Sequence, residues 1–334
     1  MSTPTDYHMS LSYVVLNGFQ LNPFFYSCPD NWTMMYPERV KSPYLGTFLM
    51  IGGSIYLTLY SLCLLAMLNR DLVRHPAYKI MVALAFCDIP SICIDSLFSG
   101  YFGFKGIHFC DYPLLIYIQG AIAFGLWMGC TFCCSALALC RISEINPDLK
   151  IGWIFKKPFL YVLMAIIFGL PFYGVFFTKP VIFRPEYMSW FLDPGTGHAD
   201  PIDYHNMTQL LSNAIEGVTT TILYTYLVSY LIRNRADNSS PRHVHMQRNV
   251  IIQAAIICFF HSVASSLYTY MQYFHSPGWL IIAAQINWQT CTGFISVIYL
   301  TLNRTIRLSV RKMLCPKKFE YGNQVSTFSN NNAF

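Results

Sequence analysis

The sequence predicts an all-α fold, a seven-transmembrane helix bundle with its N-terminus outside the cell and its C-terminus inside. Three observations predict this class. Hydrophobic residues make up 54% of the 334-residue chain and charged residues only 11%, whereas a soluble domain carries about 25% charged residues. Seven apolar windows are long enough to cross a bilayer, and Lys and Arg are concentrated in the connections on one side of them.

Each window is judged by its length. A span needs about 20 mostly apolar residues, because the hydrocarbon layer is about 30 Å thick and a helix rises about 1.5 Å per residue. Pro90 and Pro171 lie inside windows, where a proline is expected to kink the helix. The seven windows that qualify are 44–68, 77–102, 113–140, 158–178, 208–232, 249–274 and 279–302.

The orientation follows from the basic residues in the connections. One side carries 16 Lys and Arg and the other side 5, and cytoplasmic loops are the richer ones in membrane proteins. An odd number of spans then places the N-terminus outside. Asn31 and Asn206 each begin a glycosylation sequon and both fall on the outer side, so both are predicted glycosylation sites.

The chain divides into four parts by this topology. Residues 1–43 form an extracellular segment and 44–303 the transmembrane domain, while the Ser/Asn-rich tail 316–334 is expected to be disordered in the cytoplasm. Between the transmembrane domain and the tail, the sequence predicts a short interfacial helix over residues 304–315 on the anionic inner leaflet, with three arginines on one face and apolar residues on the other. Cys315 is the last residue of this segment and is either palmitoylated or an unmodified thiol.

Polar residues inside the spans are the candidates for function. Asp88, Asp95, Glu216 and His261 are ionisable groups at membrane depth, where they are costly and often functional. Aromatic and amide residues in the outer halves of the spans suit a pocket between helices, or simply bond across helix interfaces. The candidate pocket residues are Asp95, Tyr117, Gln119, Glu216, His261, Tyr268, Gln285 and Gln289.

The cysteines suggest one covalent link. Cys28 and Cys110 are the two that face the outer, oxidising compartment, so a disulfide between them is favoured over free thiols or pairing with another chain. Most of the others lie in apolar stretches, where a cysteine behaves as a small hydrophobe. Cys133 and Cys134 are adjacent in the sequence, but neither has the spacing of a metal or redox site. No cofactor is predicted, and the absence of a dense basic run argues against a nucleic-acid partner.

Several short stretches carry a resemblance to a known family. With seven spans and an outer N-terminus, the chain resembles G-protein-coupled receptors, and more narrowly the nematode serpentine receptor class T chemoreceptors. The resemblance covers most of the chain, from Tyr26 to about Arg311. It rests on residues 26–28, 78–81, Asp88, 100–101, 109–113, 117–120, Trp127, 141–142 and 298–307.

The resemblance implies roles for three residues. Asp88 matches the mid-membrane aspartate of rhodopsin-like receptors, Arg141 the arginine at their G-protein face, and Tyr299 the tyrosine of their seventh-helix motif. The chain departs from the pattern at Cys140, which stands where an acid or asparagine precedes that arginine, and at Ser296, which replaces the motif's proline. The sixth span lacks the Cys-Trp-x-Pro pattern, and residues 178–207 contain no cysteine for the usual loop disulfide, which leaves Cys28 to pair with Cys110.

The expected function is therefore that of a chemosensory receptor in the plasma membrane, in the cilia of sensory neurons. A small chemical ligand would bind between the outer helix halves, and a heterotrimeric G protein would bind the basic inner surface. A ligand-gated channel or transporter of seven-helix topology is the alternative, although no internal repeat is visible. An enzyme is not expected. The histidines of a membrane enzyme such as a desaturase would have to lie on one side to form one metal site, whereas His243 and His245 lie inside and His198 and His205 lie outside.

Overall fold

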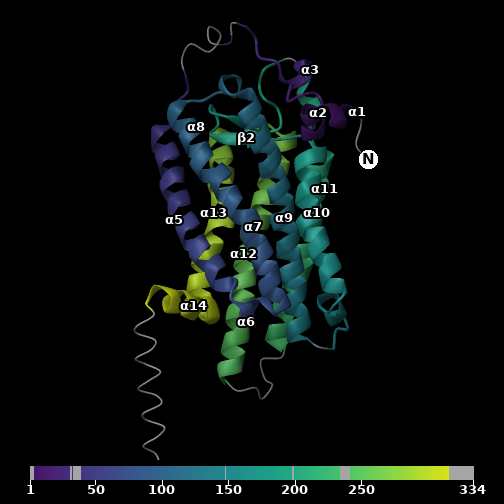
Figure 1. Ribbon diagram of the computed structural model, residues 1–334, viewed down its shortest axis with the longest axis vertical. Coiled ribbons are helices and arrows are strands. Elements are labelled where there is room, and N and C mark those ends of the chain that lie inside the picture. The colour runs from purple at the N-terminus through teal and green to yellow at the C-terminus, as the bar shows by residue number, and fades with distance from the viewer. Residues whose placement is uncertain are drawn as a thin grey trace, which may run out of the picture.

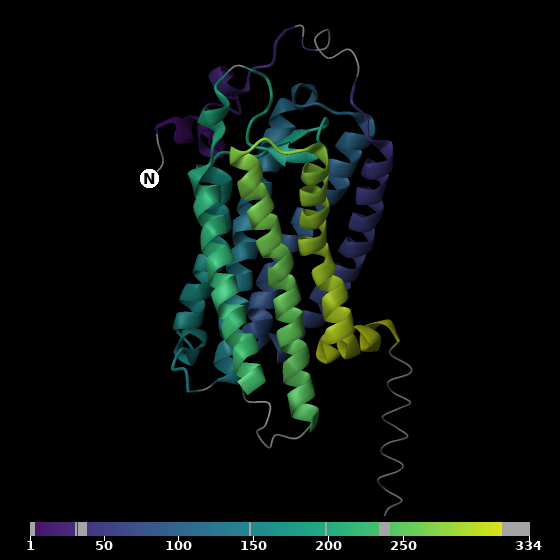
Figure 2. The same cartoon turned by 180° about the vertical axis from the view of Figure 1, so that it is seen from behind.

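A computed structural model describes residues 4–30, 32, 39–146, 148–197, 199–233 and 241–315. Long helices run side by side and traverse the molecule seven times (Figures 1 and 2). The second traverse comprises α7, a π-helical segment (Cys93–Phe98) and α8 (Ser99–Lys105) in succession. The other bounds are α5 Pro43–Met67, α7 Pro76–Ile92, α9 Pro113–Ile145, α10 Phe159–Phe177, α11 Met207–Arg233, α12 Pro241–Tyr273 and α13 Gly278–Leu302.

The helix bounds lie close to the predicted windows, with two extensions. α9 continues to Ile145, and α12 begins at Pro241. Both extensions contain charged and polar residues, which hydropathy excludes from a span but which continue a helix beyond the lipid. Pro90 and Pro171 lie within α7 and α10 as predicted. The π-helical segment begins three residues after Pro90, which cannot donate a backbone hydrogen bond.

Six helical stretches of the described chain are long and apolar enough to cross a membrane by length and composition. The remaining traverse, α11, is 27 residues long but less apolar, because polar residues recur at helical spacing along one face. Gln209, Asn213, Glu216 and Thr220 are all buried in the bundle. The opposite face is apolar and exposed, at Leu211, Ile215, Val218 and Ile222. This inside-out pattern is that of a helix whose outer face meets lipid and whose polar groups bond to neighbouring helices.

One end of the bundle, here called the disulfide end, is covered by a folded cap. The cap comprises α1 (Pro4–His8), α2 (Leu11–Leu16) and α3 (Pro23–Tyr26), which lie over the helix ends in Figure 1. A hairpin of β1 (Ile182–Arg184) and β2 (Ser189–Phe191) lies at the same end. The predicted disulfide is present: Cys28 beside α3 is bonded to Cys110 in the turn before α9.

The opposite end, the α14 end, carries two short helices, α6 (Arg70–Val73) and α14 (Arg304–Leu314). Figure 1 shows α14 turning sharply away from the axis of α13. The side chain of Asn303 caps it by accepting from the Ile306 N–H at 3.1 Å. Ile306 and Val310 are buried against the bundle, whereas Met313 and Leu314 are exposed. A helix is thus present where one was predicted, and its place on the membrane surface stays a prediction; the predicted tail 316–334 lies outside the described residues.

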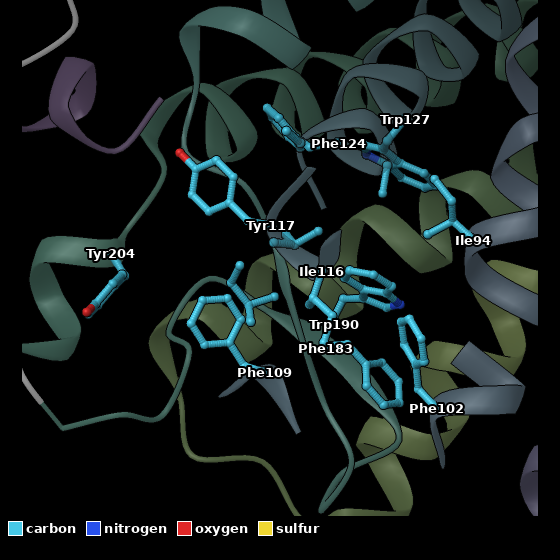
Figure 3. Packing of buried hydrophobic residues seen from close by; sticks show 14 of the residues in the cluster. Ile94, Phe102, Phe109, Ile116, Tyr117, Phe124, Trp127, Phe183, Trp190 and Tyr204 are labelled. Carbon is cyan, nitrogen blue, oxygen red and sulfur yellow. The ribbon is translucent and has the colours of Figure 1, made fainter. Parts of the chain in front are cut away.

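Two large clusters of apolar side chains fill most of the interior among the described residues, and a small third one joins Ile142 to Leu227. The cluster at the disulfide end is built around large aromatic residues, including Phe109, Tyr117 and Trp190 (Figure 3). The cluster at the α14 end is built around Tyr60, Met81 and Tyr299. Short 3-10 turns connect the elements at Phe109–Asp111, Gly152–Phe155 and Pro201–Tyr204.

Candidate functional site

The hairpin between α10 and α11 projects its side chains into the bundle. Phe183 and Trp190 pair across the two strands, with ring centroids 5.6 Å apart, and Phe183 also lies 5.6 Å from Phe102 of α8 (Figure 3). The Trp190 Nε1–H donates to Ser99 Oγ at 2.8 Å. These contacts hold both strands against α8, and the hairpin lies as a roof over part of the disulfide end of the bundle.

Beneath and beside this roof is an outer cavity of about 330 Å³. Its walls come from the hairpin, from the loop before α11 and from the outer turns of α11 and α12. Burial raises the pKa of the Tyr204 phenol, which stays protonated and donates to the Phe25 carbonyl at 2.6 Å. The lining residues are Val181, Arg184, Trp190, Phe191, Leu192, Asp193, Pro201, Tyr204, His205, Gln209, Tyr268, Met271, Gln272 and His275.

A smaller inner chamber of about 30 Å³ lies against the same wall. Val181, Trp190, Gln209 and Tyr268 line both spaces. The other residues of the inner chamber are apolar or aromatic, so no ionisable group other than the Tyr268 phenol lines it. These other lining residues of the inner chamber are Ala123, Phe124, Trp127 and Trp288.

Three predicted residues come together in one network beside the cavity. Tyr268 lines both spaces, and its hydroxyl donates to Gln285 Oε1 at 3.2 Å. Gln285 Nε2 in turn donates to the backbone carbonyl of Asp95 at 2.7 Å. The Asp95 carboxylate accepts from Ser96 and, at 2.8 Å, from Thr292 of α13. A change at Tyr268 of α12 can therefore affect the π-helical segment that contains Asp95, and also α13.

Two more predicted residues, Glu216 and His261, lie around the base of the inner chamber. Trp127, which lines the chamber, stacks on the His261 ring at 5.7 Å and donates from Nε1 to Asn213 Oδ1 at 2.9 Å. Glu216, one turn along α11 from Asn213, accepts from Ser265 of α12. Both His261 and Glu216 keep one buried polar atom without a hydrogen bond among the described residues.

The remaining pocket candidates lie elsewhere. Tyr117 donates to the Met9 carbonyl of the cap at 2.7 Å. Gln289 Nε2 donates to the Leu49 carbonyl of α5 at 2.8 Å. Gln119 is buried with its amide oxygen lacking a hydrogen bond in the described chain. None of the three lines the outer cavity or the inner chamber; Tyr117 and Gln289 instead join segments of the fold.

Nearer the α14 end, Asp88 and Tyr299 belong to a second buried cluster. Tyr60 and Cys130 donate to the Asp88 carboxylate, at 2.6 and 3.0 Å. The Tyr299 ring meets that of Tyr60 edge-on at 6.2 Å. The sequence thus predicted two residues of this cluster, Asp88 and Tyr299, but it did not predict Tyr60, which contacts both.

Arg141 pairs with an acid that the motif comparison did not find. Its Nη1 lies 2.7 Å from Glu144 Oε2, three residues further along α9, and its Nη2 donates to Met81 Sδ at 3.8 Å. Cys140 occupies the place of the expected acid, and Glu144 supplies the charge from one turn later. The i,i+3 spacing of Arg141 and Glu144 is visible in the sequence and would have identified the pair.

One predicted modification site has an unsuitable environment. Asn206 is 4% exposed; its Nδ2 donates to the Lys179 carbonyl at 3.1 Å and its Oδ1 caps α11 by accepting from the Gln209 N–H. The side chain is a buried helix cap, so the prediction of a glycan at Asn206 is not supported by this fold. Asn31 lies outside the described residues. Cys315 is exposed at the end of α14, and its palmitoylation stays a prediction.

The bundle of traversing helices and its apolar outer face are those of a multi-pass helical membrane protein. The family model described as "Serpentine type 7TM GPCR chemoreceptor Srt" matches residues 9–323, so the chain belongs to this family, as its sequence resemblance predicted. It is a family of receptors, not of enzymes. The chain is also 26% identical, over 69% of its length, to "Serpentine receptor class T-55" of Caenorhabditis elegans, and the alignment spans 63% of that relative.

Proposed function

We propose that this protein is a chemosensory receptor that binds a small chemical ligand at the disulfide end and activates a heterotrimeric G protein at the α14 end. The observation that carries the proposal is the outer cavity. Its volume of about 330 Å³ falls in the range of small-molecule sites. It lies under a fixed hairpin and shares four lining residues with the aromatic inner chamber.

The contacts behind the cavity supply a route by which a ligand can act on the helices. Tyr268 is linked through Gln285 to Asp95, and Trp127 is linked to Asn213 and His261. A ligand shifts an equilibrium between two bundle arrangements only by its differential affinity for them. A ligand that contacts Tyr268 and Trp127 would meet different surroundings whenever α12 shifts, which is the condition for such a bias.

At the α14 end, we assign the G-protein switch to Asp88, Arg141 and Tyr299. Support for this assignment comes from the burial of all three at or below 9% exposure, from their place near that end of the bundle and from the family's name. Arg141 is bound to Glu144 within its own helix. A G protein that offered Arg141 a different partner would compete with that ion pair.

The membrane placement forms part of the same proposal. We infer that the N-terminus lies outside the cell and that α14 lies along the inner leaflet of the plasma membrane. Arg304, Arg307, Arg311 and Lys312 carry its positive charge, while the exposed Met313 and Leu314 can enter the lipid. A palmitoyl chain on the exposed Cys315 would add a second anchor. Sensory cilia are the expected location.

Reconstituted protein provides the test. Purified receptor in lipid vesicles is mixed with a heterotrimeric G protein, and nucleotide exchange on the Gα subunit is measured across a panel of volatile and water-soluble odorants. The proposal expects at least one compound to accelerate exchange, and expects Tyr268→Ala to weaken that response at equal protein level. Ligand-driven ion or solute flux without G protein would instead support a channel or transporter. An N-terminal tag inaccessible on intact cells would overturn the orientation.

A further inference from the structure

One polar side chain in the wall shared by the two cavities remains without a partner. The Trp127 and Trp190 indoles donate to Asn213 and Ser99, and the Tyr268 hydroxyl donates to Gln285. The Gln209 side-chain amide, by contrast, makes no hydrogen bond with any part of the chain that the structure describes. The residue is 7% exposed and lines both cavities, and its amide atoms keep some accessible surface, so its donor and its acceptor are both open to a partner there.

The fold holds Gln209 in this position. Its backbone N–H donates to Asn206 Oδ1 at 3.1 Å, which fixes the first turn of α11. The residue is 7% exposed and lines both the outer cavity and the inner chamber. A molecule that fills the outer cavity would therefore meet this amide at the point where the two spaces adjoin.

The charges around the cavity disfavour an ionised ligand. The one arginine in the lining, Arg184, lies 3.8 Å from Glu186 and 4.0 Å from Asp193. Its guanidinium also lies over the Tyr187 ring at 5.1 Å. Arg184 and Asp193 offset each other, and the inner chamber has no charged lining residue. An ion placed there would lose its hydration without gaining an unpaired partner.

We infer that the ligand is a small uncharged molecule with one oxygen-containing polar group and a short apolar body. The polar group, a ketone or hydroxyl, bonds to the Gln209 amide, and the apolar end rests against the aromatic wall formed by Trp190 and Tyr268. Gln209 is thereby the residue that determines specificity for the polar group. The inference rests on the proposed function only in taking the outer cavity as the ligand site.

The test measures binding directly, without a G protein. Purified receptor in lipid nanodiscs is titrated with methyl propyl ketone, pentanol, pentylamine, pentanoate and pentane, and quenching of tryptophan fluorescence reports occupancy, since three tryptophans line the inner chamber. We expect the ketone and the alcohol to bind about tenfold more tightly than pentane, as one buried hydrogen bond allows. Pentylamine and pentanoate should bind no better than pentane.

Two variants locate the contact. Gln209→Met keeps the side-chain length but removes the amide, and should reduce the affinity for the ketone and the alcohol about tenfold, to that of pentane. Thr221→Val is the matched control, because Thr221 lies on the exposed face of the same helix with its hydroxyl bonded to the Gly217 carbonyl. It should change no affinity. Thermal unfolding of each variant shows whether it has kept its fold.

The outcomes separate this inference from the proposed function. Tighter binding of pentylamine or pentanoate overturns the ligand class, as does an unchanged ketone affinity in folded Gln209→Met, or no binding by any probe. If pentylamine or pentanoate binds more tightly and also drives nucleotide exchange on Gα, the receptor function stands although the ligand class is wrong. If the ketone binds through Gln209 but no compound drives exchange, the ligand class stands and the coupling proposal fails.

Discussion

The two ends of the bundle differ in their ion pairs and in the covalent link, among the described residues, although buried hydrogen bonds such as that of Tyr60 to Asp88 also join helices near the α14 end. At the disulfide end, contacts join segments far apart in the sequence: Cys28 is bonded to Cys110, and Lys179 Nζ lies 2.8 Å from Asp6 Oδ1 of the cap. At the α14 end, the ion pair of Arg141 lies within its own helix. Contacts of the first kind resist the movement of helices relative to each other, and contacts of the second kind do not.

The difference suits a receptor in which one end keeps a shape and the other changes it. A cavity that recognises a small molecule gains affinity when its walls are fixed before binding. An end that must open for a partner gains from contacts that survive the movement of a helix. The comparison leads to four predictions, which run from the largest expected effect to the smallest.

Removal of the disulfide tests the first half of the comparison. The double variant Cys28→Ser/Cys110→Ser opens a link between residues 82 positions apart. A disulfide closing a loop of this size contributes about 2 to 5 kcal/mol to stability. We expect a clearly lower thermal unfolding temperature in detergent and less receptor at the cell surface. Cys315→Ser, which removes an exposed thiol at the other end, should leave the unfolding temperature in detergent unchanged; equal melting of all three proteins would mean that the disulfide does not hold the cap.

Gly120→Ala tests whether the hairpin must sit where it does. A Cβ built on Gly120 of α9 would lie 1.5 Å from the Val181 carbonyl oxygen, which is backbone and cannot rotate away. The methyl must displace the backbone of Val181, which directly precedes β1 and lines both cavities, at a cost of about 1 to 3 kcal/mol. Ligand binding should be largely lost, as measured by tryptophan quenching. Gly217→Ala on α11, where a Cβ meets nothing within 4 Å, should bind normally. Normal binding by Gly120→Ala would show that the hairpin position is unimportant.

The same contrast separates what the sequence predicts from what it does not. Long apolar windows predicted the traverses, and the two outer cysteines predicted the disulfide, because length and compartment are properties of the chain itself. Tyr117 and Gln289 matched a pocket by residue type, yet which way a helix faces depends on its neighbours, and both point to other segments. Gln209 lies at the start of a span, where polar residues are common, so only the fold distinguishes it from an ordinary helix end.

Asn206 and Asn31 test whether the folded cap sets the use of a sequon. Endoglycosidase treatment should shift the gel mobility of Asn206→Gln as much as that of the unaltered receptor. The variant should nevertheless lose about 1 kcal/mol of stability, because the α11 cap is lost. Asn31→Gln is expected to do the reverse, removing the mobility shift without changing thermal unfolding. A mobility shift that depends on Asn206 would mean that its side chain is accessible to the glycosylation machinery, contrary to its burial.

Glu144→Gln tests the second half of the comparison and has the smallest expected effect. The variant frees Arg141 from its ion pair, and because the Glu144 side chain is 42% exposed, the pair is worth only about 0.5 kcal/mol. If Arg141 must leave Glu144 to meet the G protein, basal nucleotide exchange should rise about twofold, whereas Arg141→Ala should abolish ligand-evoked exchange. Asp148→Asn is the matched control, since it removes the same charge at the same end from a carboxylate that makes no ion pair among the described residues. An equal rise in both acid variants would trace the effect to surface charge and leave the Arg141 contact without a role in activation.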